Sequence, residues 1–120
     1  MAKILVHVTC GPEQPTRAAL AFFVARAVVE EGHAVTVFLA GDAVQLLRDP
    51  VLDALNGLGT GSLREHYEKV VAGGGRFIVS GASSKARGVL ESDLAGKPFE
   101  FGTPHLLVRL ALEHDRMINY

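Results

Sequence analysis

The sequence predicts a three-layer α/β/α sandwich around a mostly parallel sheet of four or five strands. Three observations support this fold class: apolar segments of strand length alternate with longer helical segments, helices begin at proline or a capping side chain, and helices end at glycine. Strands that alternate with helices form βαβ units, which place parallel strands in one sheet and helices on its faces. A chain of 120 residues can bury one core, so we expect a single domain over residues 1–120.

The first strand–helix–strand unit occupies the N-terminal third of the chain. The apolar run Lys3–Val8 is expected to be a buried strand. Pro15 should open a helix, because its missing N–H and fixed φ suit the first turn. That helix should continue to about Glu31 and stop at Gly32, which can adopt a left-handed cap conformation. Ala34–Leu39 is then the second strand, parallel to the first.

The middle of the chain has a looser pattern. Asp42 is a candidate cap for a short helix that reaches Leu47 or Arg48. The stretch Asp49–Gly61 contains one proline and three glycines, which predicts a variable or mobile connection.

A second helix–strand unit follows this connection. Ser62 and Glu65 have the spacing of a capping box, in which the two side chains satisfy two free backbone N–H groups at a helix start. The helix should reach Ala72 and end in the glycines Gly73–Gly75, and Arg76–Val79 is then the third strand.

The chain after the third strand is expected to begin with a brief helix. Ser83 or Ser84 would cap this helix, which runs through Arg87. A further short strand could lie within Val89–Phe101.

The last helix and strand have clearer signals. Thr103 followed by Pro104 combines a capping hydroxyl with a proline in the first turn, so a helix should run from here to about Glu113. Arg116–Tyr120 is expected to be the final strand.

The first helix is apolar around nearly its whole circumference. Phe22, Phe23, Ala25 and Val29 broaden its apolar stripe well beyond one face. Such a helix needs cover on more than one side. One side can be covered by the sheet, and the other by a second subunit, which predicts self-association. The alternative is that the loop region folds over the helix.

Composition excludes several classes of protein. The chain has 12 Lys and Arg against 13 Asp and Glu, without a run of like charge, so we expect no nucleic-acid partner. The single cysteine forms no internal disulfide, which fits a reducing compartment. No segment has the pattern of a signal peptide or is long enough to span a bilayer, so the expected location is the cytoplasm, without membrane attachment.

The predicted working surface is the rim where the parallel strands end, because ligands of open parallel sheets bind beyond the carboxyl ends of the strands. Three segments reach this rim: Thr9, Cys10 and Gly11 after the first strand, Ala40–Asp42 after the second, and Ser80–Gly88 after the third.

The segment Ser80–Gly88 has the composition of an anion site. Gly81 lets the backbone approach a ligand, hydroxyls can donate hydrogen bonds, and Lys85 and Arg87 supply positive charge near a helix start. The alternative is an ordinary strand–turn–helix with a serine cap and two solvated cations. No phosphate loop, dinucleotide fingerprint or nucleophile elbow is present, so we expect no cofactor and no hydrolase triad.

Cys10 lies a few residues before the first helix, whose positive end would favour a thiolate. An unpaired cysteine is more often a small buried apolar residue than a nucleophile. His7 could approach it across the strand end. The five histidines show no zinc-binding spacing, so no metal site is expected.

The succession of these segments resembles the DsrE/DsrF-like family of small sulfur-relay proteins over essentially the whole chain. The matching segments are Ile4–Gly11 with the Pro15–Glu31 helix, Gly32–Phe38 with the Gly41 turn, Phe77–Gly81 with Lys85–Gly88, and Asp115–Tyr120. The resemblance implies an α/β/α subunit that assembles as a homotrimer or homohexamer and acts near intracellular sulfur transfer.

The sequence departs from this family at Ser80. In the sulfur-carrying members the corresponding residue is a cysteine that holds a persulfide, and a serine hydroxyl cannot hold sulfane sulfur. Three hypotheses follow for function. The protein binds a small molecule, an anion or a sulfur-relay partner protein at the rim through Thr9, Cys10, Gly11, Ser80, Gly81, Lys85 and Arg87. Alternatively it transfers sulfur as a thiol enzyme or carrier using Cys10, or it is a non-catalytic structural or regulatory subunit.

Overall fold

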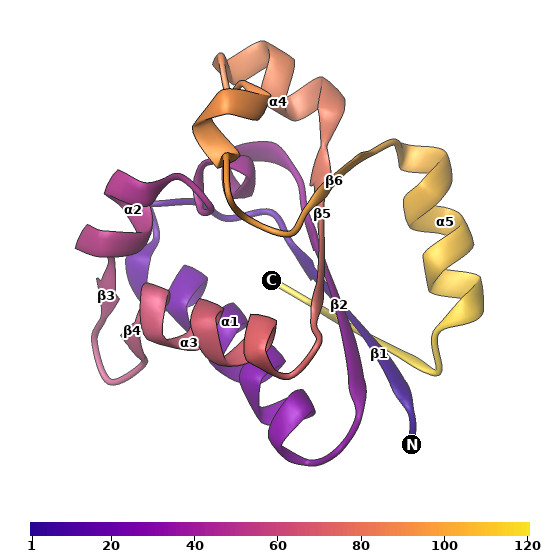
Figure 1. Ribbon diagram of the computed structural model, residues 1–120. Coiled ribbons are helices and arrows are strands. Elements are labelled where there is room, and N and C mark those ends of the chain that lie inside the picture. The colour runs from indigo at the N-terminus through magenta and orange to yellow at the C-terminus, as the bar shows by residue number, and fades with distance from the viewer.

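The computed structural model describes residues 1–120 and has the predicted three layers (Figure 1). One sheet contains five strands in the order β6-β5-β2-β1-β7, and every neighbouring pair is parallel. Its strands are β1 (Lys3–Val8), β2 (Ala34–Leu39), β5 (Arg76–Ser80), β6 (Glu100–Gly102) and β7 (Arg116–Asn119). Because all five run in one direction, their carboxyl ends meet at one edge of the sheet.

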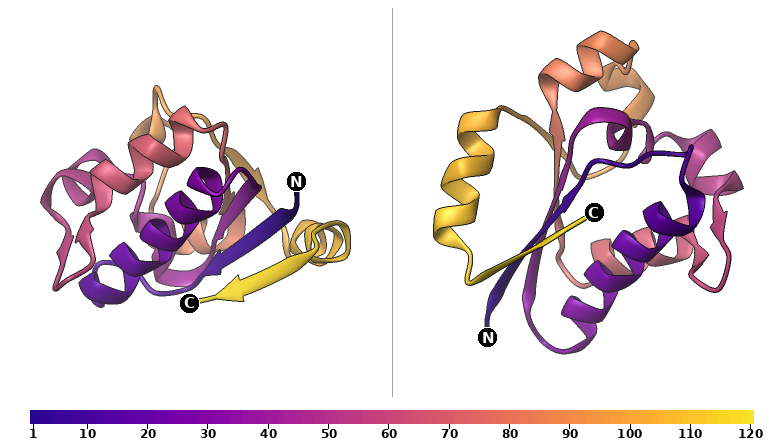
Figure 2. Two further views of the ribbon diagram at one scale, coloured as in Figure 1. Left: turned by 90° about the horizontal axis from the view of Figure 1, so that it is seen from below. Right: turned by 180° about the vertical axis from the view of Figure 1, so that it is seen from behind.

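The helices cover the two faces of the sheet unequally (Figures 1 and 2). α1 (Pro15–Glu30) and α3 (Leu63–Ala72) lie on one face, and α5 (Pro104–Glu113) lies alone on the other. The short helix α4 (Gly81–Arg87) lies beyond the strand ends, at the top of Figure 1. Two 3-10 turns, η1 (Gly41–Gln45) and η2 (Glu91–Leu94), complete that end of the molecule.

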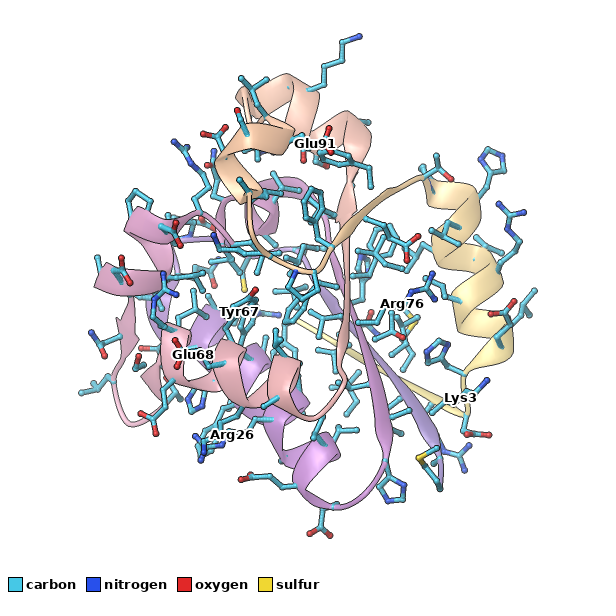
Figure 3. The ribbon with its side chains drawn as sticks, viewed as in Figure 1. Lys3, Arg26, Tyr67, Glu68, Arg76 and Glu91 are labelled. Atoms are coloured by element: carbon cyan, nitrogen blue, oxygen red, sulfur yellow. The ribbon has the colours of Figure 1, made fainter.

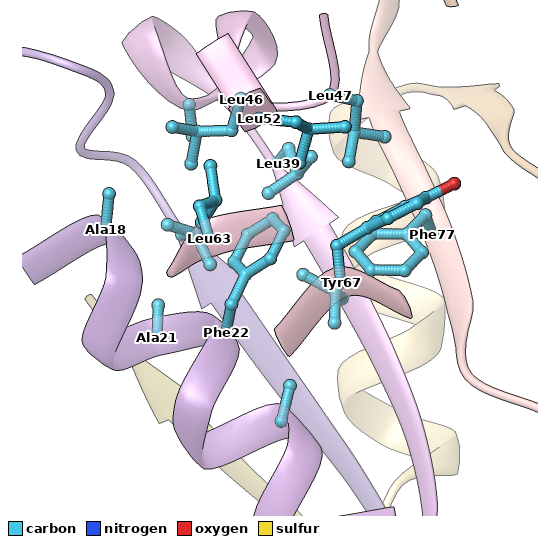
Figure 4. Close-up of a cluster of buried hydrophobic side chains, with 14 of the residues drawn as sticks. Ala18, Ala21, Phe22, Leu39, Leu46, Leu47, Leu52, Leu63, Tyr67 and Phe77 are labelled. Atoms are coloured by element: carbon cyan, nitrogen blue, oxygen red, sulfur yellow. The ribbon is translucent and has the colours of Figure 1, made fainter. Parts of the chain in front are cut away.

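The main core lies between the sheet and the pair α1 and α3 (Figure 4). Phe22 of α1, Phe77 of β5 and Tyr67 of α3 stack there in tilted contacts, with ring centroids 5.7 Å apart for Phe22–Phe77 and 5.3 Å for Tyr67–Phe77. Leu46 and Leu47, which follow η1, close the top of this cluster with Leu52 of α2 and Leu63 of α3. On the other face a separate cluster forms under α5 from Leu5, Phe38, Ile78 and Leu110.

Most helix boundaries agree with the sequence signals. Pro15 is the first residue of α1, and Gly32 beyond its end has a φ of 85°. Thr103 caps α5, because its hydroxyl accepts a hydrogen bond from the N–H of Leu106 at 3.2 Å. The further short strand expected within Val89–Phe101 is β6, whose bounds extend one residue beyond that range.

Two predicted caps differ from the structure. Asp42 does not cap η1; its carboxylate pairs with Arg87 instead. The cap of α4 is Ser80, and neither Ser83 nor Ser84, because the helix begins immediately after β5.

The expected capping box of α3 is half formed. The Ser62 hydroxyl accepts from the N–H of Glu65 at 3.2 Å, as predicted. The Glu65 carboxylate instead pairs with Arg26 of α1 at 3.5 Å. An ion pair to a neighbouring helix has therefore replaced the second contact of the box.

The segment expected to be a variable or mobile connection has regular structure. It forms α2 (Asp49–Ala54), with Pro50 in the first turn, and the antiparallel hairpin of β3 (Asn56–Gly57) and β4 (Gly61–Ser62). Gly59 and Gly61 have φ values of 74° and 79°, so here the glycines shape a tight turn.

The outer side of α1 is covered by this hairpin and by α3 (Figure 1). A Cβ at Gly57 would lie 3.0 Å from the Cβ of Ala19, so the hairpin backbone approaches the helix closely. Part of the cover that the sequence assigned to a second subunit, or alternatively to a folded loop, is provided by the hairpin and α3, while Leu20 stays 37% exposed. Part of Phe23 stays exposed.

Candidate functional site

The rim at the strand ends brings α4 together with the loops after β1 and β2. α4 follows β5 without an intervening loop, because the Ser80 side chain caps the helix directly. The Ser80 hydroxyl accepts from the N–H of Ser83 at 3.2 Å and is buried. Gly88 ends the helix with a φ of 66°, a left-handed conformation that glycine adopts readily. Ser80 therefore has a structural role as the cap of α4.

The loop after β2 is fastened to α4 by side chains of both segments. The N–H of Gly41 donates to the Ser83 hydroxyl at 2.9 Å. The Arg87 guanidinium donates to the Asp42 carboxylate at 2.9 Å and to the Ser83 carbonyl at 3.2 Å. Arg87 is thus engaged within the protein, and its charge is largely balanced by Asp42.

The loop after β1 packs against the same turn. A side chain at Gly11 would overlap the backbone carbonyl of Asp42, so only glycine fits there. The N–H of Gly11 donates to the Glu13 carboxylate at 2.7 Å. Thr9 donates from both its backbone N–H and its hydroxyl to the Tyr120 carbonyl, each at 2.8 Å. Thr9 and Gly11 therefore shape the rim by their backbone and internal bonds.

Cys10 lies inside the main core and is 6% exposed. Burial raises the pKa of the thiol, Glu13 raises it further, and the Arg17 guanidinium opposes the rise in part. The neutral thiol is therefore favoured at neutral pH, which is the unreactive form.

His7 does not approach Cys10. It lies on the opposite face of the sheet, where its ring meets the edge of Phe38 and its Nδ1 is 3.3 Å from Asn119 Oδ1. A strand residue and a residue beyond the strand end can point to opposite faces, which is the geometry found here. The pair offers no thiol–imidazole site.

The open part of the rim is a pocket of about 280 Å³ beside α4. Its walls are Gly81, Ser84 and Lys85 of α4, the following residues Val89, Leu90 and Glu91, and Phe101 of β6. Glu91 projects near α4 at the top of Figure 3. Leu90 and Phe101 are large apolar side chains that remain partly exposed here.

Three polar side chains in this pocket, those of Lys85, Ser84 and Glu91, have no partner within the chain. Lys85 forms no ion pair, in contrast to Arg87 two residues later. The Ser84 side chain is buried, and its hydroxyl makes no hydrogen bond. A lysine beside apolar walls suits the anionic end of a partly apolar ligand, and the Glu91 carboxylate adds an opposite charge to the same pocket.

The structure thus divides the seven residues predicted to line the rim. Gly81 and Lys85 line the pocket, whereas Ser80 and Arg87 support α4 and the β2 turn. Leu90 and Phe101, together with Ser84, Val89 and Glu91, were not predicted as walls of the pocket. Nothing in the sequence marks the first two as neighbours, because β6 returns to the edge of β5 only in the folded chain.

Two further features of the molecule bear on its chemistry. No group of three or more His, Cys, Asp and Glu side chains is placed to hold a metal ion. None of the helices has both the length and the apolar character needed to cross a membrane.

The architecture and the rim define a class of small parallel-sheet α/β/α proteins with a short capped helix at the end of the third main strand. The family model of the DsrE/DsrF-like family matches residues 2–120. The chain belongs to this family, which is related to sulfur relay.

Solved structures agree with the fold. The chain is similar to the ychN protein from E. coli, with a TM-score of 0.75 and 19% identity, and to a protein of unknown function, MTH1491, from Methanobacterium thermoautotrophicum, with a TM-score of 0.71 and 14% identity. In both comparisons 100% of each chain is covered. No curated protein matches the chain.

Proposed function

We propose that this protein is a cytoplasmic, homo-oligomeric DsrE/DsrF-like protein that carries no persulfide and binds an anionic small molecule at the pocket beside α4. The observation that carries the proposal is the unpaired Lys85 ammonium beside the apolar walls Leu90 and Phe101. The neighbouring cation Arg87 is already neutralised by Asp42. Lys85 is thus the free positive charge of this pocket.

The absence of a reactive thiol supports the first half of the proposal. Ser80 replaces the cysteine of the sulfur-carrying members, and its hydroxyl is engaged as a helix cap. Cys10 is buried with a raised pKa, so it does not supply a thiolate to the rim. A ligand-binding role is therefore better supported than sulfur transfer.

The ligand proposal is tested with phenylacetate and with its uncharged analogue phenylacetamide, each titrated into isotope-labelled protein and followed by amide shifts in NMR. Phenylacetate should shift amides of 81–91 and 101, and phenylacetamide should bind more weakly because it lacks the charge that pairs with Lys85. Lys85→Met removes the charge and keeps the aliphatic stem. Lys69→Met, at an exposed lysine of α3 without an ion pair, is the matched control.

The expected result is loss of phenylacetate shifts in Lys85→Met and their retention in Lys69→Met. Equal binding of both compounds, or unchanged binding in Lys85→Met, would contradict the assignment of Lys85.

Self-association is supported by the exposed apolar side chains of α5. Val108 is 59% exposed and Leu112 is 81% exposed, on the face of α5 that points away from the sheet. A surface hollow of about 550 Å³ is lined only by α5 residues, among them Val108. With walls from one helix it cannot enclose a small ligand, but a second subunit could cover it.

Light scattering on the purified protein tests this assembly. We expect the mass of a trimer or hexamer for the wild type and a smaller mass for Leu112→Asp. Leu58→Asp, at an equally exposed leucine on the hairpin tip, should keep the wild-type mass. A monomeric wild type would contradict the oligomer proposal.

A further inference from the structure

The pocket beside α4 carries two opposite charges that are not paired with each other. Lys85 of α4 and Glu91 of η2 both line it, and both side chains are exposed. Neither residue takes part in any ion pair of the chain. The ammonium and the carboxylate are therefore both available to one ligand in this pocket.

Hydrogen bonds fix the segment that carries the carboxylate. After α4 the chain turns back, and the N–H of Val89 donates to the Ser84 carbonyl at 2.9 Å. The N–H of Leu90 then donates to the Asp93 carboxylate at 2.7 Å, and the N–H of Asp93 donates to the Leu90 carbonyl at 2.9 Å. These bonds hold the backbone that leads into Glu91, so the carboxylate is placed beside α4 by the fold.

The apolar walls of the pocket suit a small apolar group. Leu90 is 63% exposed and Phe101 is 41% exposed. The Phe101 ring meets the Phe99 ring edge to face, with centroids 5.2 Å apart, which orients its open surface. The volume of about 280 Å³ lies at the lower limit of sites for drug-sized ligands, about 300 Å³, so a ligand of this pocket is small.

A buried hydroxyl in the same wall lacks a hydrogen-bond partner. The Ser84 side chain is 2% exposed, and its Oγ makes no hydrogen bond. A serine hydroxyl can donate or accept, and a buried one without a partner destabilises the protein. Ser84 lines the pocket, so the polar head of a ligand bound here can supply the missing bond, whether that head is a carboxylate or an ammonium.

We infer that the ligand of this pocket is a small apolar or aromatic amino acid. Its carboxylate pairs with Lys85, its ammonium pairs with Glu91, and its side chain lies against Leu90 and Phe101. This inference rests on the proposed ligand site and narrows its ligand. A simple anion is attracted by Lys85 but repelled by Glu91, whereas an amino acid satisfies both charges. Glu91 is thus the residue that determines specificity.

Three compounds that share one ring and one chain length test this inference. 3-Phenylpropionate is L-phenylalanine without the ammonium, and phenethylamine is L-phenylalanine without the carboxylate. Each is titrated at about pH 7, where both groups are charged, into isotope-labelled protein, and the amide shifts of residues 81–91 and 101 are followed by NMR. We expect L-phenylalanine to bind about threefold more tightly than either analogue, because each analogue lacks one solvent-exposed ion pair.

Two variants assign the preference to one carboxylate. Glu91→Gln keeps the size of the side chain and removes its charge, so it should abolish the advantage of L-phenylalanine over 3-phenylpropionate. Glu31→Gln is the matched control, at an exposed glutamate that follows the last residue of α1 and forms no ion pair. It should keep the wild-type preference.

The outcomes separate this inference from the proposed function. If 3-phenylpropionate binds the wild type as tightly as L-phenylalanine, or if Glu91→Gln keeps the preference, the amino-acid assignment is overturned and the anion site at Lys85 stands. If phenethylamine binds most tightly, or if no compound shifts amides of 81–91 and 101, both the amino-acid assignment and the anion site are overturned.

Discussion

The two faces of the sheet differ in how much apolar surface they bury. The face under α1 and α3 belongs to a cluster of 24 buried residues, whereas the face under α5 has a cluster of four. Buried apolar area is the main source of folding free energy, so the first face should dominate stability. The second face leaves apolar side chains of α5 in solvent, where they are available for association.

Truncation of one core residue on each face gives the largest expected contrast. Phe22→Ala removes a fully buried ring between α1 and β5 and should lower the free energy of unfolding by about 3–5 kcal/mol. Leu110→Ala, under α5, should lower it by about 2–3 kcal/mol, near the low end for leucine, because few buried neighbours surround it. Urea denaturation monitored by circular dichroism measures both values. A larger loss for Leu110→Ala would reverse the comparison.

On the face under α5, removal of a helix cap should lower stability less than the truncation of a core side chain. Thr103→Ala deletes the hydroxyl that accepts from the N–H of Leu106, and should lower the free energy of unfolding by about 1 kcal/mol. Thr103→Ser keeps the hydroxyl and should be nearly neutral. If urea denaturation shows equal stability for Thr103→Ala and the wild type, α5 does not contribute to the cooperative unfolding unit.

The pH dependence of stability should also differ between the faces. Burial lowers the pKa of His7 under α5, with the Asn119 hydrogen bond opposing the shift in part. The unfolded chain then binds the proton more readily, so stability is complete above the ordinary value of 6.5 and declines as pH falls below it.

On the face under α1 and α3, burial raises the pKa of Cys10 and of Tyr67. Their neutral forms are favoured in the folded protein, so stability declines as pH rises above the ordinary cysteine value of 9.0. Urea midpoints measured from below pH 6.5 to above pH 9.0 should show both declines in stability. His7→Gln should reduce only the decline at low pH. An unchanged acid decline in that variant would remove His7 from the account.

The sequence was sufficient to predict the elements whose signals are local. Pro15 and Thr103 mark helix starts by their own backbone and side-chain chemistry, and Gly32 marks a helix end, so these boundaries follow from neighbouring residues alone. The family resemblance could also be inferred from the order of segments.

Features that depend on contacts between distant segments could not be predicted. The glycines of Asp49–Gly61 suggest flexibility by composition, yet they allow a hairpin to approach α1. The side chains of Asp42 and Glu65 do not form the predicted capping contacts. Asp42 pairs with Arg87 and Glu65 pairs with Arg26, and both arginines come from other segments of the chain. Arg87 has such a partner in Asp42, whereas Lys85 has none.

The central claim is that the rim of this DsrE/DsrF-like protein binds an anionic small molecule and carries no sulfur. Intact-mass measurement after treatment of the folded protein with inorganic polysulfide tests it most directly, with Cys10→Ser as the comparison. We predict that the wild type gains no sulfur atom, because its one thiol, Cys10, is buried with a raised pKa. A wild type that gains sulfur, and loses this capacity in Cys10→Ser, would contradict the account and assign the carrier role to Cys10.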